Sequence, residues 1–153
     1  MPGRLSAIRS AAAELIASAE LVVETNGEGF TDITRDAARF VEQCGAGEGA
    51  LLLYLRHTSA SLVIQENADP DVQTDLVTAL RRLAPDDGPW VHTIEGPDDM
   101  PAHIKTMLTG VSLYVPVRGG ALALGTWQGI YLVEHRTRPH RREVMLQFVG
   151  SRK

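Results

Sequence analysis

Apolar residues recur at helical spacing in two segments of the chain, residues 35–44 and 71–83, which therefore predict helices. Residues 100–108 are a third, shorter helix candidate. Residues suited to a helix start precede or open each segment. Thr34 is the expected N-cap of the first helix, the turn Asp69-Pro70 precedes the second, and Pro101 lies in the first turn of the third.

Short apolar runs bounded by turn residues predict β-strands in the rest of the chain. The expected strands cover residues 20–25, 50–56, 61–64, 111–117, 121–126, 129–135 and 143–149. Residues 45–49 should break the chain, Arg-Gly-Gly at 118–120 should form a hairpin, and the charged residues 136–142 should separate the last two strands. The alanine-rich residues 11–19 fit either a helix or a direct lead into the first strand. Many short strands with a few helices predict an α+β domain built on antiparallel sheet.

Length and charge narrow the class of protein further. The 153 residues fit one domain, with residues 1–13 as an N-terminal extension and residues 14–153 as the folded part. A net charge of −4 does not suit a general nucleic-acid binder, although a few local cations could hold a small anion. The single cysteine, Cys44, excludes an intrachain disulfide and is expected to be a buried small hydrophobe rather than a nucleophile. No run approaches the roughly 20 apolar residues that span a bilayer, so we expect a cytoplasmic protein without a membrane partner.

Polar groups are dense in the segment 57–69, which follows an apolar strand. His57 can bind a metal or transfer protons. Glu66, Asn67 and Asp69 offer oxygen atoms that suit a hard cation or a polar ligand. A solvated loop with Asx-type turns explains the same residues, and the sequence alone leaves both interpretations open.

His92 and His103 lie eleven residues apart in a second polar segment, a spacing that matches no standard zinc motif. Asp98 and Asp99 come between them, just before a predicted helix, where carboxylates favourably face the positive end of the helix dipole. If His103 faces inward, it could meet His92 and His57. Three imidazoles with an open position would suit a catalytic zinc site.

Candidate residues also occur in the last third of the chain. Gln128 lies beside Gly129 at a strand that is either bulged or bent close to a ligand or partner. Glu134 ends an apolar strand and could be a general base or a partner of a metal ligand. Phosphate could be bound by Arg136, Arg138, Arg141 and Arg142, with a solvated basic loop as the alternative. His135 and His140 are expected to be solvated, although the sequence leaves open whether His92 or His135 is the better third metal ligand.

Five stretches of sequence together resemble the YjbQ-like family, which is associated with secondary thiamine-phosphate synthase activity. They read GFTDIT at 29–34, HTSASLVIQENADPDV at 57–72, EGPDDMPAHIK at 95–105, SLYVPV at 112–117 and LALGTWQGIYLVEHR at 122–136. The resemblance covers roughly residues 20 to 150. Gln65 departs from the family, which usually has Asn at this position.

The resemblance implies a compact antiparallel β-sandwich of the jelly-roll type with a few packed helices, assembled as a homotrimer. It also implies a transferase that joins a pyrimidine pyrophosphate to a thiazole phosphate and releases pyrophosphate. The alternative is a trimeric module that binds a metal or a small anion without turnover. The expected partner of the transferase is a small phosphorylated molecule.

The resemblance and side-chain chemistry together assign roles to individual residues. A divalent metal, expected to be zinc, would be held by His57, His92 and His103. The catalytic residues would be Glu66, Asn67, Asp69 and Glu134, and the substrate-binding residues would be Ser59, Lys105, Gln128 and Arg136.

Overall fold

The computed structural model describes residues 2–153, which form eight strands and three helices. The strands are β1 (Leu15–Asn26), β2 (Gly29–Asp32), β3 (Ala46–Leu55), β4 (Ala60–Glu66), β5 (Ser112–Arg118), β6 (Ala121–Leu122), β7 (Gln128–Glu134) and β8 (Pro139–Arg152). The helices are α1 (Thr34–Gln43), α2 (Pro70–Leu83) and α3 (Asp99–Thr109).

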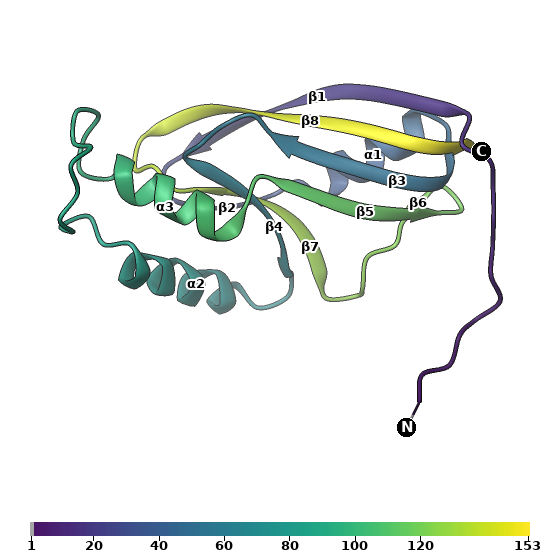
Figure 1. Cartoon of the computed structure of the whole chain (residues 1–153), viewed down its shortest axis with the longest axis horizontal. Coiled ribbons are helices and arrows are strands. Elements are labelled where there is room, and N and C mark those ends of the chain that lie inside the picture. The colour runs from purple at the N-terminus through teal and green to yellow at the C-terminus, as the bar shows by residue number, and fades with distance from the viewer. Residues whose placement is uncertain (1) are drawn as a thin grey trace.

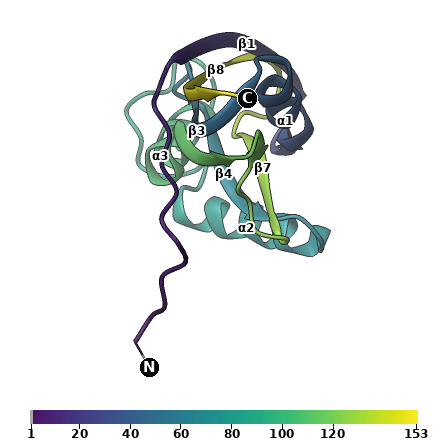
Figure 2. The same ribbon diagram turned by 90° about the vertical axis from the view of Figure 1, so that its right-hand side faces the viewer.

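Two antiparallel sheets form the body of the protein (Figure 1). The larger sheet has the order β1-β8-β3-β5-β6, and the smaller one has the order β2-β7-β4. Helix α2 lies at the lower side of the molecule in both views and contacts β2, and α3 lies beside the start of β4 (Figures 1 and 2). The expected antiparallel α+β domain with three helices is therefore confirmed within residues 2–153. The large sheet is curled, and this topology does not define a clear jelly-roll sandwich.

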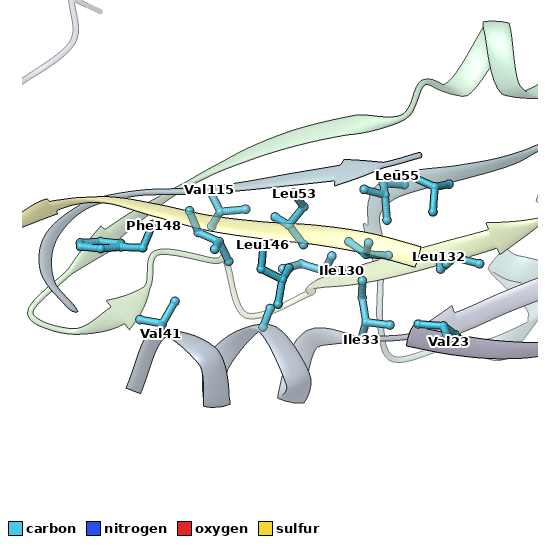
Figure 3. Close-up of a cluster of buried hydrophobic side chains, with 14 of the residues drawn as sticks. Val23, Ile33, Val41, Leu53, Leu55, Val115, Ile130, Leu132, Leu146 and Phe148 are labelled. Carbon is cyan, nitrogen blue, oxygen red and sulfur yellow. The ribbon is translucent and has the colours of Figure 1, made fainter. Parts of the chain in front are cut away.

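The core lies on the inner faces of the two sheets, as strand alternation requires. On β3, Leu51, Leu53 and Leu55 are each at most 1% exposed, whereas Leu52 and Tyr54 on the opposite face are 40% and 53% exposed. Side chains from β5, β7, β8 and α1 pack against the inner leucines (Figure 3). Leu51, Leu53 and Leu55 thus serve the core of the chain itself.

The structure decides between two alternatives in the N-terminal half and corrects one prediction there. Residues 15–26 form one long strand paired with β8, so the alanine-rich stretch leads directly into the first strand and does not form a helix. Residues 46–49 belong to β3 instead of breaking the chain, although the pairing register shifts between Ala46 and Gly49. Glycine is needed there for close approach: a Cβ on Gly150 would lie 2.1 Å from the Glu48 carbonyl oxygen.

Other element boundaries also differ from the predictions. Ile33, not Thr34, is the N-cap of α1, and the Thr34 hydroxyl instead accepts from the Ile130 N–H at 2.8 Å. Strand β6 has only two residues, and β8 begins at Pro139, inside the charged stretch expected to be a loop. Cys44 packs partly buried against the core. Within residues 2–153, none of the helices is long and apolar enough to cross a membrane.

Candidate metal centre

His92, Asp99 and His103 converge at the start of α3, which we call the open group. Asp99 is the first residue of α3 and His103 lies one turn later, so both side chains share a helix face. His92 reaches them from the loop between α2 and α3. Its Nε2 lies 2.6 Å from Asp99 Oδ2, and His103 Nε2 lies 3.1 Å from the same oxygen.

Backbone contact decides the tautomer of His103. Its Nδ1 lies 2.8 Å from the Thr58 carbonyl oxygen, which can only accept, so Nδ1 carries a proton. Nε2 then faces Asp99 Oδ2, which also only accepts while the carboxylate is ionised. The pair is stable if His103 is a cation or if a metal ion lies between the two atoms. Metal-binding histidines commonly donate their second nitrogen to a backbone carbonyl in this way.

Arg136 supports the carboxylates of this centre. Its Nη1 donates to Asp99 Oδ1 at 2.8 Å and its Nε donates to Asp98 Oδ2 at 2.9 Å. Burial alone would raise the pKa of Asp98, but the hydrogen bond from Arg136 and the Thr137 N–H lower it to about 2. For Asp99, burial likewise raises the pKa, and the contacts with His92, His103 and Arg136 outweigh that effect and lower it. Both carboxylates are therefore ionised at neutral pH.

The donor set suits a divalent ion such as zinc. One nitrogen of each histidine and one Asp99 oxygen all lie within 4.8 Å of one another. Ligand atoms about 2.1 Å from a tetrahedral ion are about 3.4 Å apart, so a small separation of His92 from Asp99 would admit the ion. The Asp99 side chain is 2% exposed, whereas those of His92 and His103 are 43% and 32% exposed. The centre is thus anchored on its buried side and accessible on the other.

Glu134 and Arg142 form a second charged cluster, the closed group, deeper in the protein. Arg142 Nε donates to Glu134 Oε1 at 2.8 Å, its Nη2 donates to Oε2, and Thr25 Oγ1 donates to Oε1 at 2.6 Å. Burial would raise the pKa of Glu134, but the Arg142 and Thr25 hydrogen bonds lower it. Ser59 accepts from Arg142 through both its carbonyl and its hydroxyl. The expected catalytic Glu134 and substrate-binding Ser59 are thus both engaged by one arginine.

His57 lies beside the closed group and not in the open group. Its Nε2 accepts from the Glu143 N–H at 2.9 Å, and its Nδ1 lies 3.4 Å from Arg142 Nη1. Burial, followed by the positive charge of Arg142, lowers the pKa of His57. The structure therefore brings together two of the three histidines expected to bind metal.

Lys105 and His135 are buried beneath α2. Lys105 is 2% exposed, and its Nζ donates to Glu28 Oε2 at 3.1 Å. The expectation that His135 is solvated is wrong, because it is 2% exposed and its Nε2 lies 2.8 Å from Ser61 Oγ. Burial, and next the charge of Lys105, lowers the pKa of His135 to about 4. Lys105 therefore has an ion-pair partner inside the fold rather than a free ammonium in the open group.

The remaining predicted site residues lie at the other end of β4. Ala60 pairs with Glu134 whereas Glu66 pairs with Gln128, and six strand residues span about 20 Å. Their polar groups serve local structure, as the Asx-turn alternative suggested. Asp69 caps α2 by accepting from the Asp71 N–H, and Glu66 accepts from the Asp69 N–H, both at 2.9 Å.

Asn67 and Gln128 have similar structural contacts. Asn67 Nδ2 donates to the Thr126 carbonyl oxygen at 3.2 Å, and Gln128 Oε1 accepts from the Gly125 N–H at 2.8 Å. Within one chain, the open group and this end of β4 are separate.

Two residues that the structure makes central were not among the site residues assigned from the sequence. Asp99 was explained by the helix dipole, although its spacing of four residues from His103 on a helix places both on one face. Arg142 was one of several arginines in a charged stretch, and only the sheet pairing shows that it meets Glu134. Local spacing could have identified Asp99, but no local signal identifies Arg142.

Two antiparallel sheets with a histidine–carboxylate group at a helix start define a small α+β protein with a candidate metal centre. The family model described as UPF0047 protein YjbQ-like matches residues 19–151, and the chain belongs to this family. The family suggested by the five sequence stretches is thus confirmed. The match leaves the whole of the expected N-terminal extension, residues 1–13, outside it.

Individual relatives come from bacteria and archaea. The chain is 48% identical over 132 residues to the UPF0047 protein sll1880 of Synechocystis sp., covering 86% of this chain and 90% of that protein. It is 36% identical over 131 residues to the UPF0047 protein MJ1081 of Methanocaldococcus jannaschii, covering 85% and 92%. The crystal structure of the hypothetical protein APE1520 from Aeropyrum pernix matches with a TM-score of 0.82 and 32% identity, covering 88% of this chain and 99% of that one.

Proposed function

We propose that the open group binds a divalent metal, zinc in the first instance, through His92, Asp99 and His103. The observation that carries this proposal is the convergence of three possible ligand atoms: one nitrogen of each histidine and one Asp99 oxygen lie within 4.8 Å of one another. Because His103 Nδ1 contacts the Thr58 carbonyl oxygen, Nε2 is the nitrogen that faces Asp99, and a cation between Nε2 and Asp99 Oδ2 would bind to both atoms. His57 is left out of the ligand set because its ring nitrogens contact Glu143 and Arg142 instead.

The proposed activity is transfer or cleavage at a phosphorylated small molecule, of the thiamine-phosphate synthase type that the family resemblance implies. A bound divalent ion supplies Lewis-acid chemistry that polarises a phosphate oxygen or a bound water. The chain contributes orientation: the Thr58 carbonyl holds His103, and the buried side of Asp99 is held by Arg136. The exposed sides of His92 and His103 leave room for a substrate to approach.

A homotrimer is part of this proposal. The outer face of the large sheet carries apolar side chains that no element of the same chain covers within residues 2–153. Leu52, Tyr54 and Tyr114 are 40%, 53% and 64% exposed there, and a second copy would bury them. Association could also bring Glu66, Asn67, Asp69 and Gln128 of one copy near the open group of another. Light scattering on the full chain should give three times the 16.6 kDa chain mass.

A binding module without turnover is the second candidate, and it is favoured by the ion pairs that the basic side chains Lys105 and Arg136 already form. Lys105 is paired with Glu28, and Arg136 is paired with Asp98 and Asp99. Neither side chain is free to neutralise a phosphate without leaving a carboxylate. A metal site that binds a small anion directly would need neither of them.

Metal content per chain is the test of the proposed site. Protein purified without a histidine tag should hold close to one equivalent of zinc or a similar metal. His103→Ala and Asp99→Asn should hold none, and His140→Ala should match the wild type. Metal that persists in both ligand variants, or that is absent from the wild type, would disprove the site.

Turnover separates the two candidate functions. The transferase predicts release of pyrophosphate from a pyrimidine pyrophosphate and a thiazole phosphate, lost in His103→Ala. Saturable binding of either compound without product favours the module.

A further inference from the structure

One guanidinium group joins three parts of the candidate centre. Arg136 donates to Asp99 Oδ1, to Asp98 Oδ2 and to the Glu95 carbonyl oxygen, each at 2.8–2.9 Å. Its side chain is only 11% exposed. All three nitrogens of the guanidinium thus have acceptors inside the protein.

We propose that Arg136 is a positioning residue for the metal centre, and not a phosphate ligand. Its guanidinium donates a hydrogen bond to Asp99 Oδ1, and the other carboxylate oxygen, Oδ2, contacts both imidazoles. Through Glu95, Arg136 also anchors the loop three residues after His92. This inference rests on the metal site proposed above and adds the residue that shapes it.

The backbone position of Arg136 makes it suitable for orienting the proposed metal ligands. It follows β7 by two residues, and its own N–H donates to Glu134 Oε2 at 3.1 Å. Because Arg142 holds Glu134 in the closed group, the base of Arg136 is attached to a rigid, buried part of the sheet. The guanidinium therefore links the sheet to the start of α3 and to the loop that carries His92, and so fixes where both lie relative to the sheet.

Charge and geometry both argue against phosphate binding by the same group. Two ionised carboxylates, Asp98 and Asp99, lie against the guanidinium and would repel an approaching phosphate. A planar fork is also what the three acceptors require, because they lie in different directions around Arg136. Lysine carries the same charge but cannot direct its protons in this fixed pattern.

The test compares Arg136→Lys and Arg136→Gln with the wild-type chain, using Co²⁺ alone as the probe. Both variants should bind Co²⁺ about 10- to 100-fold more weakly, as the loss of a residue that orients a metal ligand commonly causes. At saturating Co²⁺ their visible absorption band should also change in intensity, because Asp99 is then free to bind through both oxygens. Arg138→Gln, at an exposed arginine two residues away, is the matched control.

Each outcome is decisive. Wild-type affinity and an unchanged spectrum in Arg136→Lys would show that charge alone suffices, and the proposal would be wrong. Weaker binding with an unchanged spectrum at saturation would mean a merely structural role, as would failure of both variants to fold. If the wild type itself binds no Co²⁺, the proposed metal site is wrong, and the role of Arg136 that depends on it is wrong as well.

Discussion

The open group and the closed group both contain carboxylates and basic side chains, but they differ in how deeply these side chains are buried and in what they contact. In the closed group, Glu134 and Arg142 are 1% and 3% exposed, and both carboxylate oxygens of Glu134 have donors. In the open group, Asp99 Oδ2 is shared by His92 and His103, whose side chains remain partly exposed. Glu134 is held by donors that the fold supplies, whereas Asp99 Oδ2 contacts two imidazoles that are themselves potential metal ligands.

This difference suggests separate roles: the charges of the closed group stabilise the fold, and those of the open group are suited to binding a ligand. Buried charges that are completely paired stabilise one arrangement and have no capacity left for a ligand. A partly exposed group of imidazoles and a carboxylate can instead exchange its hydrogen bonds for bonds to a cation. Predictions that remove one group at a time therefore test whether the two have these separate roles.

Arg142→Met should produce the largest effect on stability. It leaves the Glu134 carboxylate buried without its partner, so the free energy of unfolding should fall by about 3–5 kcal/mol. Urea unfolding measures the change, and Arg141→Met at the exposed neighbour should shift it by no more than about 0.5 kcal/mol. Adding Glu134→Leu to Arg142→Met should recover much of the loss. A loss below about 1 kcal/mol would contradict a closed group that stabilises the fold.

Acid should destabilise the protein through His135, which lies near the closed group. Its folded-state pKa is about 4, lowered from 6.5 mainly by burial. Between these values the unfolded chain binds a proton that the folded chain does not, so stability is lost as the pH falls from 6.5 to 4. The contribution amounts to roughly 3 kcal/mol at pH 4.

His135→Gln should remove this component of the pH dependence. The carboxylates that also titrate in acid remain in both proteins, so the difference between the two stability curves isolates the histidine. Chemical unfolding at several pH values provides the curves. Parallel curves for wild type and variant would show that His135 takes up its proton while folded.

Metal should stabilise the wild type through the open group alone. At a free zinc concentration 100 times the Kd, binding to the folded state adds about 2.7 kcal/mol. His103→Ala and Asp99→Asn should lose this gain, and without metal His103→Ala should lose only about 1 kcal/mol, from the hydrogen bond to Thr58. Thermal unfolding with zinc and with a chelator measures both. A zinc-dependent shift that survives in both variants would place the metal elsewhere.

Asp69→Ala should have the smallest effect, although the family resemblance assigned this residue a catalytic role. Loss of the N-cap of α2 should cost about 1 kcal/mol of stability. Metal content should stay at the wild-type value, because Asp69 lies at the far end of β4 from the open group. A loss of metal in this variant would instead favour a site completed by a neighbouring copy.

Much of the fold could be predicted from local pattern. The helix predicted at 71–83 is observed at Pro70–Leu83, and the predicted strand 111–117 is observed at Ser112–Arg118. The errors occur where strand pairing sets what the local pattern does not. Residues 46–49 contain two glycines and were expected to break the chain, but they belong to β3, which pairs with β8. For the alanine-rich residues 11–19 the sequence left helix and strand open, and pairing with β8 decides for the strand from Leu15 onward.

The candidate site was only partly predictable for a related reason. His92 and His103 lie in a segment whose polar residues and sequence resemblance both indicated chemistry. His57 was expected to join them, but the pairing of β3 with β8 places it against Glu143 and Arg142. Spacing along a chain says nothing about such a contact between residues 86 positions apart.

By itself, the sequence determined the family, the antiparallel α+β class and the segments that carry polar chemistry. These properties follow from local periodicity, turn residues and contiguous stretches of sequence. Only the tertiary structure decided which side chains meet: Glu134 with Arg142 in the closed group, and Asp99 with His92 and His103 in the open group. Sheet register and the docking of α3 bring distant residues together, and a hydrogen bond depends on a distance in space that no local pattern contains.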